Sequence, residues 1–137
     1  MSAKPETTFI ASIHKYLPQS VYRMKNHNPY VGGVPDVWYS GPTGDLWVEY
    51  KFIVLPKRPD TPIVLTGAKG LLSALQQKWL RDRHEEGRNV AVCVGWKEGG
   101  VWLPDDNWSR YAYTAESFTE QMLSRADLAT SICQYTG

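Results

Sequence analysis

Cysteines and long apolar runs are scarce in this chain, and both shortages limit what the protein can be. Its two cysteines, Cys93 and Cys133, are too few for a disulfide framework or a zinc-binding set. No apolar run approaches the ~18 residues that a membrane-spanning helix needs, and the N-terminal MSAKPETTF has no signal-peptide core. These absences favour a soluble globular protein in a reducing compartment. We expect a cytoplasmic location, in a bacterium or in a phage-infected host cell.

The net charge is also small, but the charges are unevenly distributed along the chain. The 137 residues, enough for one domain, carry a formal net charge of +1. Residues 1–97 contain 13 Lys or Arg against 8 Asp or Glu, whereas residues 98–137 contain 2 against 6. A basic body fits a polyanion-binding face, although many neutral enzymes share this pattern. The six tryptophans and eight tyrosines suit base stacking, yet such residues in small domains mostly belong to cores or interfaces.

The hydrophobic periodicity predicts a single α/β domain, with a mixed central sheet flanked by helices. The apolar run 90–96 is typical of a central strand that is covered on both faces. The segment 53–70 holds three prolines and two glycines, which indicates a long surface insertion. The expected helices are 5–17, 71–86 and 117–133, and the expected strands are 20–25, 34–40, 46–52, 90–96 and 101–103.

The helix expected at 71–86 has its own signals. Gly87 stands at the position that commonly follows the end of a helix. Four side chains are expected to face inward: Leu72, Leu75, Trp79 and Leu80.

Two carboxylates and a lysine are expected to meet on the hairpin formed by the second and third strands. Alternation turns Glu49 and Lys51 to one face of their strand. If the turn pairs Ser40 with Asp45, Asp36 lies opposite Glu49 with Cβ atoms roughly 4.5–5.5 Å apart. Like charges that close need a compensating cation, and oxygen ligands suit Mg²⁺ or Mn²⁺. The alternative is a solvated strand face on which the glutamate and the lysine neutralise each other.

A third carboxylate, Glu6, is expected to point inward from the first helix. It shares a stripe with Ile10, Ile13 and Leu17 at steps of three and four residues. A charged group on that stripe needs a partner, which a metal site would supply. The alternative is a first-turn glutamate stabilised by the helix dipole.

Several cationic side chains are candidates for contacts with phosphate. Arg23 and Lys25 alternate on the strand that leads toward Asp36, where ordinary surface charge is the alternative for Arg23. His27 lies in a loop beside the expected site, although loop histidines are more often simply solvated. Three further cations lie in the insertion, which alternatively is a solvated tether or covers a partner subunit: Lys57, Arg58 and Lys69.

The hairpin motifs resemble a known signature. GVPD at residues 33–36, followed by WVEYK at 47–51, resembles the PD-(D/E)XK signature of restriction-endonuclease-like nucleases. LSALQ at 72–76, which opens a helix leading into VAV at 90–92, is similar to the virus-type replication-repair nuclease (VRR-NUC) branch. Glu6 matches an acid that recurs in the first helix of that branch and of archaeal-type Holliday junction resolvases.

The resemblance covers about residues 6–96 and departs from the family in two places. The insertion lengthens the usual step from the lysine to the glutamine-containing helix. The aromatic segment 100–113, within a C-terminal part of 97–137, has no counterpart. Both departures bear on substrate preference more than on chemistry.

The resemblance implies a restriction-endonuclease-like domain over residues 1–137 and a Mg²⁺-dependent DNA endonuclease, with Mn²⁺ as a substitute. Asp36 and Glu49 would bind the metal, with the Tyr50 carbonyl and Glu6 completing its ligands. Lys51 would act on the attacking water and on the transition state, and Gln76 would contact DNA.

The resemblance further implies a structure-selective activity on branched or junction DNA, in phage or mobile-element replication, recombination or repair. A non-catalytic nucleic-acid- or protein-binding module that keeps the fold is the alternative. Resolvases of this type work as homodimers, which makes DNA and a second copy the expected partners. The candidates for the centre of a dimer interface, or alternatively for a second small core, are Trp102, Trp108, Tyr111 and Tyr113.

Overall fold

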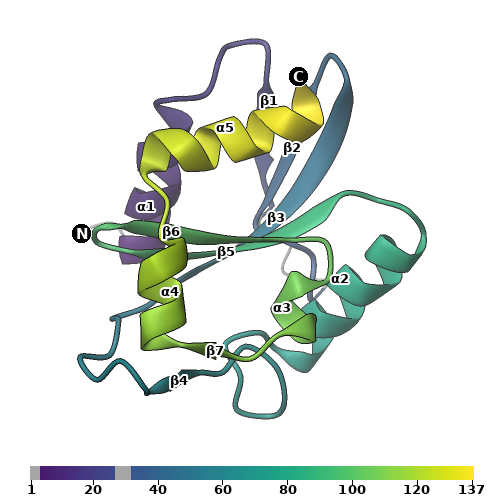
Figure 1. The fold of residues 1–137 in the computed structure, drawn as a ribbon. Helices are drawn as coiled ribbons and strands as arrows, with labels where there is room; N and C mark the ends of the chain where they lie inside the picture. The colour runs from purple at the N-terminus through teal and green to yellow at the C-terminus, as the bar shows by residue number, and fades with distance from the viewer. Residues whose placement is uncertain (1–3, 27–31) are drawn as a thin grey trace.

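Five strands form a mixed central sheet in the computed structural model, which describes residues 4–26 and 32–137 (Figure 1). The strands β3 and β5 run parallel, and the other three neighbouring pairs are antiparallel. This arrangement confirms the α/β class predicted from the sequence. In spatial order the strands are β1 (Tyr22–Lys25), β2 (Val37–Gly41), β3 (Gly44–Phe52), β5 (Val90–Trp96) and β6 (Gly99–Pro104).

Helices cover both faces of the sheet (Figure 1). One face packs against α1 (Pro5–His14) and α5 (Arg125–Thr136), with Phe9, Tyr50 and Ile132 in its core. The other face packs against α2 (Ala74–Glu85), α3 (Asn107–Arg110) and α4 (Ala115–Gln121). None of the helices in the described part of the chain is both long and apolar enough to cross a bilayer.

The register of the β2–β3 hairpin is the one predicted. Ser40 pairs with Asp45 as expected, and Gly41 also pairs with Gly44, so the loop has two residues, 42–43, and not the four of the expected turn 41–44. Asp36 lies one residue before the first pair, where β2 begins. Because cross-strand positions are fixed by this short turn, Asp36 is carried to the end of the hairpin where Glu49 lies.

Three helix boundaries differ from the predictions for local reasons. The first helix ends at His14, ahead of the expected residue 17. The last helix, expected at 117–133, is two helices, because the chain is extended at Met122 and Ser124 starts α5 by accepting a hydrogen bond from the Asp127 N–H. The helix α2 starts only at Ala74, since Ser73 caps it.

Because α2 starts at Ala74, one of the residues expected to face inward is exposed instead. Leu75 lies in the first turn of α2 and is 59% exposed, whereas Leu72 and Leu80 are buried as predicted. The predicted stop after this helix is confirmed, because Gly87 has a φ of 87°.

The insertion 53–70 is only partly a surface segment. Its strand β4 (Pro62–Ile63) pairs with β7 (Tyr113–Thr114), and Ile63 and Leu65 are buried under the α2 side of the sheet. The aromatic segment supplies the other half of this small layer, with Trp108 1% and Tyr113 7% exposed. For these two residues the alternative of a second small core is confirmed, and their predicted place at the centre of a dimer interface is wrong.

Candidate active site

Glu49 is buried in the middle of the sheet, with only 2% of its surface exposed. Its Oε2 lies 3.4 Å from the Lys51 Nζ and accepts a hydrogen bond of 3.2 Å from the Gln76 Nε2. Its Oε1 is buried without a hydrogen-bond partner among the residues that the structure describes. Burial, and then the neighbouring Asp36 carboxylate, raise the pKa of Glu49 to about 9. A buried carboxylate with one unpaired oxygen is costly, and a bound cation would offset that cost.

Asp36 is fixed beside Glu49 by the main chain of β3. Its Oδ2 accepts a hydrogen bond of 2.9 Å from the Tyr50 N–H, and its own carbonyl accepts from the Asn26 N–H at 2.8 Å. In a strand, the N–H and C=O of one residue point to the same side. The Tyr50 carbonyl therefore faces the side on which Asp36 lies.

A glycine before Asp36 brings the hairpin close to α2. Gly33 has a φ of 86°, and a Cβ on it would lie 2.5 Å from the Leu75 carbonyl oxygen. No other residue type fits a left-handed conformation in such close contact. The contact places the loop before Asp36 against the first turn of α2, the turn that carries Gln76.

Gln76 both caps its own helix and contacts Glu49, whereas the sequence predicted only a contact with DNA. Its Oε1 accepts from the Ser73 N–H at 2.9 Å and completes the capping box of α2, while its Nε2 reaches Glu49. The structure thus brings Gln76 to the carboxylates. Its contact with DNA stays a prediction.

Glu6 approaches the pair from α1. It is half-buried and lines a cavity of about 190 Å³ with Asp36 and Lys25. Burial first, and then Asp36, raise the pKa of Glu6. Within residues 4–26 and 32–137, however, no three His, Cys, Asp or Glu side chains gather closely enough to form a metal cluster. Asp36 and Glu49 form a pair, and the metal role of Glu6 stays a prediction.

Below the carboxylates lies a buried hydrogen-bonded chain that was not predicted. The Tyr50 and Tyr39 hydroxyls are 2.6 Å apart, and the Tyr39 hydroxyl is 2.7 Å from the His14 Nε2. Burial, followed by the charge of Arg23, lowers the pKa of His14 to about 4, so the ring is neutral near pH 7. This chain ties α1 to β2 and β3 beneath the site. The one signal in the sequence is that both tyrosines occupy inward positions of their strands, where a hydroxyl needs a partner.

The cations proposed for DNA contact are spread over several places. Arg23 donates to the main-chain carbonyls of His14, Pro18 and Val21, at 3.0 to 3.5 Å, and so braces the end of α1. Lys25 lines the cavity at the carboxylates. His27 lies outside the described residues. The three insertion cations, Lys57, Arg58 and Lys69, are exposed, and the Arg58 Nε lies 3.8 Å from Asp60.

The residues present fit a divalent cation. The Asp36 and Glu49 carboxylates are neighbours, and the unpaired Glu49 Oε1 is a buried oxygen without a partner among the described residues. Hard cations such as Mg²⁺ and Mn²⁺ prefer oxygen ligands of this kind. Lys51 lies beside the pair with 22% of its side chain exposed, so it is open to a substrate.

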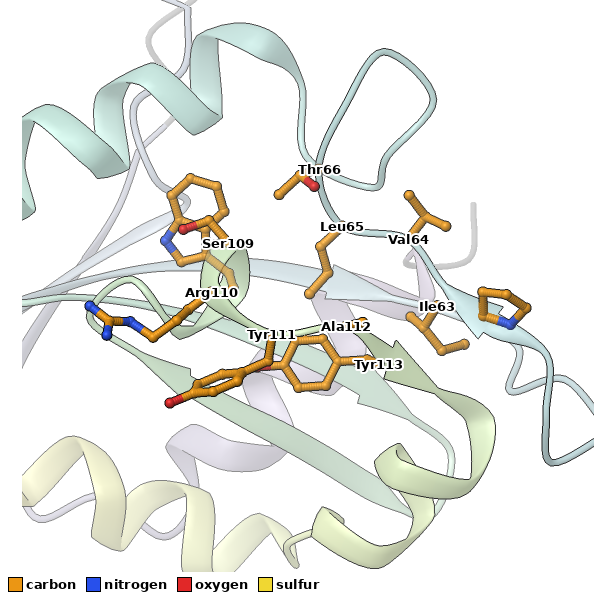
Figure 2. A pocket seen from close by; sticks show the side chains of 11 residues that line it. Ile63, Val64, Leu65, Thr66, Ser109, Arg110, Tyr111, Ala112 and Tyr113 are labelled. Atoms are coloured by element: carbon orange, nitrogen blue, oxygen red, sulfur yellow. The ribbon is translucent and has the colours of Figure 1, made fainter.

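A different cavity, of about 350 Å³, lies between residues 62–66 and 108–113 (Figure 2). Its walls are mostly apolar and aromatic, and the guanidinium of Arg110 is held at 2.9 Å by Asp106. Within the described ranges, 4–26 and 32–137, no carboxylate lines it. This cavity therefore does not compete with the Asp36–Glu49 pair as the catalytic site.

Comparison with known proteins supports the fold. No protein-family model and no curated protein matches this sequence. Among solved structures, the chain is similar to Hjc of Archaeoglobus fulgidus, described as a Holliday junction resolvase from an archaeal hyperthermophile. The TM-score is 0.55 at 16% identity, over 93% of this chain and 97% of the other. The chain thus has a restriction-endonuclease-like fold, as predicted, and the VRR-NUC branch gains no support.

Proposed function

We propose that this chain is a divalent-metal-dependent DNA endonuclease that hydrolyses phosphodiester bonds. The observation that carries the proposal is the buried Glu49 beside Asp36, with Lys51 on the same strand face. The likeness to a resolvase supports it at the level of the fold, although one fold can host unrelated functions. The chemistry of the three side chains, more than the likeness, points to phosphodiester cleavage.

Asp36, Glu49 and the Tyr50 carbonyl would hold Mg²⁺ or Mn²⁺, with Glu6 as a further oxygen donor. When bound, the cation would polarise the scissile phosphate and lower the pKa of a water. Lys51 would orient the attacking water and stabilise the negative charge that develops on the phosphate. Gln76 is a positioning residue, because it holds the Glu49 Oε2 through its amide.

The substrate class follows less directly from the site. We propose structure-selective cleavage of branched or junction DNA, by a homodimer that acts in replication, recombination or repair of phage or mobile-element DNA in the cytoplasm. The similar archaeal protein is a Holliday junction resolvase, which supports the junction-DNA part of this proposal. Of the four aromatic residues considered for the dimer interface, Tyr111 is the one with a largely exposed side chain, at 59%.

Replacing Asp36 tests the catalytic site. Asp36→Asn keeps an oxygen for the Tyr50 N–H but removes the charge that a cation needs, so we expect no detectable cleavage of junction, flap, nicked or linear DNA in Mg²⁺. The control is Asp45→Asn, because Asp45 is an exposed carboxylate at the other end of the same hairpin. Cleavage by the Asp36 variant at the wild-type rate would contradict the assignment.

The same assay addresses the non-catalytic alternative. A wild-type protein that binds these DNAs but cuts none of them, in either Mg²⁺ or Mn²⁺, would be a binding module. The panel of substrates also ranks junctions against nicks, flaps and ends.

The insertion cations give a prediction about binding. Replacing Lys57, Arg58 and Lys69 with alanine should lower the slope of log affinity against log salt by about 1 for each lost phosphate contact. The insertion follows directly from β3, which carries the catalytic residues. The control is Arg88→Ala, which removes one exposed positive charge just after the C-terminal end of α2. It shows how much the slope changes when a charge outside the insertion is lost. Identical slopes for the wild type and the triple variant would identify the loop as a solvated tether or a subunit contact.

A further inference from the structure

A cationic cavity lies on the α1–α5 side of the sheet, next to the C-terminal ends of β3 and β5. Its volume is about 400 Å³. The floor contains the rings of Phe9 and Phe52, whose centroids are 5.7 Å apart, and the rim carries Lys97 and Arg125. Among the residues that the structure describes, no carboxylate lines this cavity. The Arg125 guanidinium therefore borders the recess without a carboxylate beside it, while the Lys97 Nζ lies 5.2 Å from the centroid of the Trp96 ring.

Arg125 is held in place by neutral groups. Its Nε donates to the Ser12 Oγ at 2.7 Å, its Nη2 donates to the Lys97 carbonyl at 3.3 Å, and its guanidinium lies 5.2 Å from the centroid of Phe9. Two of its five N–H donors are used in this way, which leaves three for an incoming acceptor. Neither Arg125 nor Lys97 forms an ion pair with any residue in 4–26 or 32–137. The guanidinium is thus preorganised by neutral groups and lacks a carboxylate partner among the described residues.

The Phe9 ring in the floor is tightly packed against the sheet. A Cβ on Gly95 would lie 2.6 Å from the Phe9 ring, and a Cβ on Gly100 would lie 2.9 Å from it. The ring therefore sits directly on the backbone of β5 and β6. An apolar floor suits a flat or weakly polar part of a ligand.

The cavity is adjacent to the candidate active site. Phe52 directly follows Lys51 in β3, and its partner in β5 is Gly95, two residues before Lys97. The helix α1 separates the two recesses, since Glu6 lines the one at Asp36 while Phe9 lines this one. Because side chains alternate along β3, Lys51 and Phe52 point to opposite faces of the sheet, so a DNA strand would pass around the end of β3 to reach both recesses.

We propose that this cavity binds one unpaired nucleotide of the DNA strand next to the cleaved bond. The phosphate contacts Arg125 and Lys97, because a guanidinium fork and an ammonium are the usual partners of phosphate oxygens. The sugar and base edge lie against Phe9 and Phe52. The recess suits a group of small-molecule size, such as one nucleotide, more than a duplex. This assignment rests on the proposed nuclease function and names a part of its substrate.

The test is the salt dependence of binding to a labelled single-stranded oligothymidylate and to a duplex of equal length, measured by fluorescence anisotropy in EDTA. We expect Lys97→Gln and Arg125→Gln each to lower the single-strand slope by about 0.7, and the duplex slope by less. Arg125→Lys, which keeps the charge, should retain most of the slope. Arg88→Gln is the matched control, because Arg88 precedes β5 whereas Lys97 follows it.

Thermal melts establish whether each variant is folded, since Arg125 also braces Ser12. If Arg125→Gln does not fold, Lys97→Gln and Arg125→Lys carry the test. Unchanged slopes with normal wild-type cleavage would overturn the subsite and leave the proposed function standing. An equal loss in Arg88→Gln, or a larger loss on duplex than on single strands, would also overturn it. A wild-type protein that neither binds nor cuts DNA would overturn both.

Discussion

Replacing Glu49 with glutamine should abolish cleavage and, in the absence of metal, make the folded protein more stable. The glutamine keeps the shape of a side chain that is 2% exposed but cannot supply a negative ligand. Stabilisation of transition-state charge by a metal is worth several kcal/mol, and each 1.36 kcal/mol is a factor of ten in rate. We therefore expect turnover to fall by at least about 10³-fold.

The stability effect has a defined pH dependence. In the metal-free folded state the pKa of Glu49 is about 9, against an ordinary value of 4.5. Between these two values the folded protein binds a proton that the unfolded chain has released, so acidification stabilises the fold through this group. The wild type should lose this contribution as the pH rises through 9. The gain in stability of Glu49→Gln should therefore be largest above pH 9 and shrink toward pH 4.5.

The measurement is thermal unfolding over a pH series in EDTA, repeated at neutral pH with Mg²⁺. Mg²⁺ should raise the melting temperature of the wild type and leave that of Glu49→Gln unchanged, because a ligand stabilises only a state that binds it. Glu85→Gln, at the end of α2 and exposed, is the matched control. A Glu49 variant that still responds to Mg²⁺ or still cuts DNA would show that the metal site is elsewhere.

The hairpin that carries the candidate site was predictable from the sequence because its determinants are local. Alternation places Glu49 and Lys51 on one face, and the short turn sets the register, so the closeness of Asp36 and Glu49 follows from counting residues. The start of α2 is equally local, since Ser73 and Gln76 form its capping box. The inward position expected for Leu75 was wrong because the apolar spacing alone does not show where a helix begins.

Long-range contacts were not predictable in the same way. The Gln76 amide donates a hydrogen bond to Glu49, which lies 27 residues earlier in the sequence. The hydrophobic periodicity of α2 does not reveal that this side chain bonds to β3 as well as to its own helix N-terminus. The burial of Ile63 depends on pairing between β4 and β7, which lie in segments that the sequence presents as a loop and an aromatic stretch. Neither segment has strong strand character alone, so each is ordered by the other.

Replacing Lys51 with methionine should separate catalysis from metal binding. The Lys51 Nζ lies 3.4 Å from the Glu49 Oε2, on the partly exposed side of the carboxylate pair. A cation at this distance repels a bound metal, so its removal should leave metal affinity similar or higher once Glu49 is deprotonated. In other enzymes the loss of one hydrogen-bond donor aimed at transition-state charge costs about 10²–10³-fold in turnover, and we expect a loss of this order for Lys51→Met.

The experiment compares metal affinity by calorimetry with single-turnover cleavage at saturating Mg²⁺, for wild type, Lys51→Met and Lys51→Arg. Lys51 lowers the pKa of Glu49, so in Lys51→Met a proton competes more strongly with the metal for the Glu49 carboxylate. The calorimetry therefore extends to high pH, where this competition is weaker. Lys78→Met, which removes an exposed lysine paired with Asp82, is the control. The arginine variant keeps the charge with a different shape, so it should recover part of the rate. If Lys51→Met instead loses metal affinity at every pH but cleaves normally at saturating Mg²⁺, Lys51 supports the fold of the site and does not act on the phosphate.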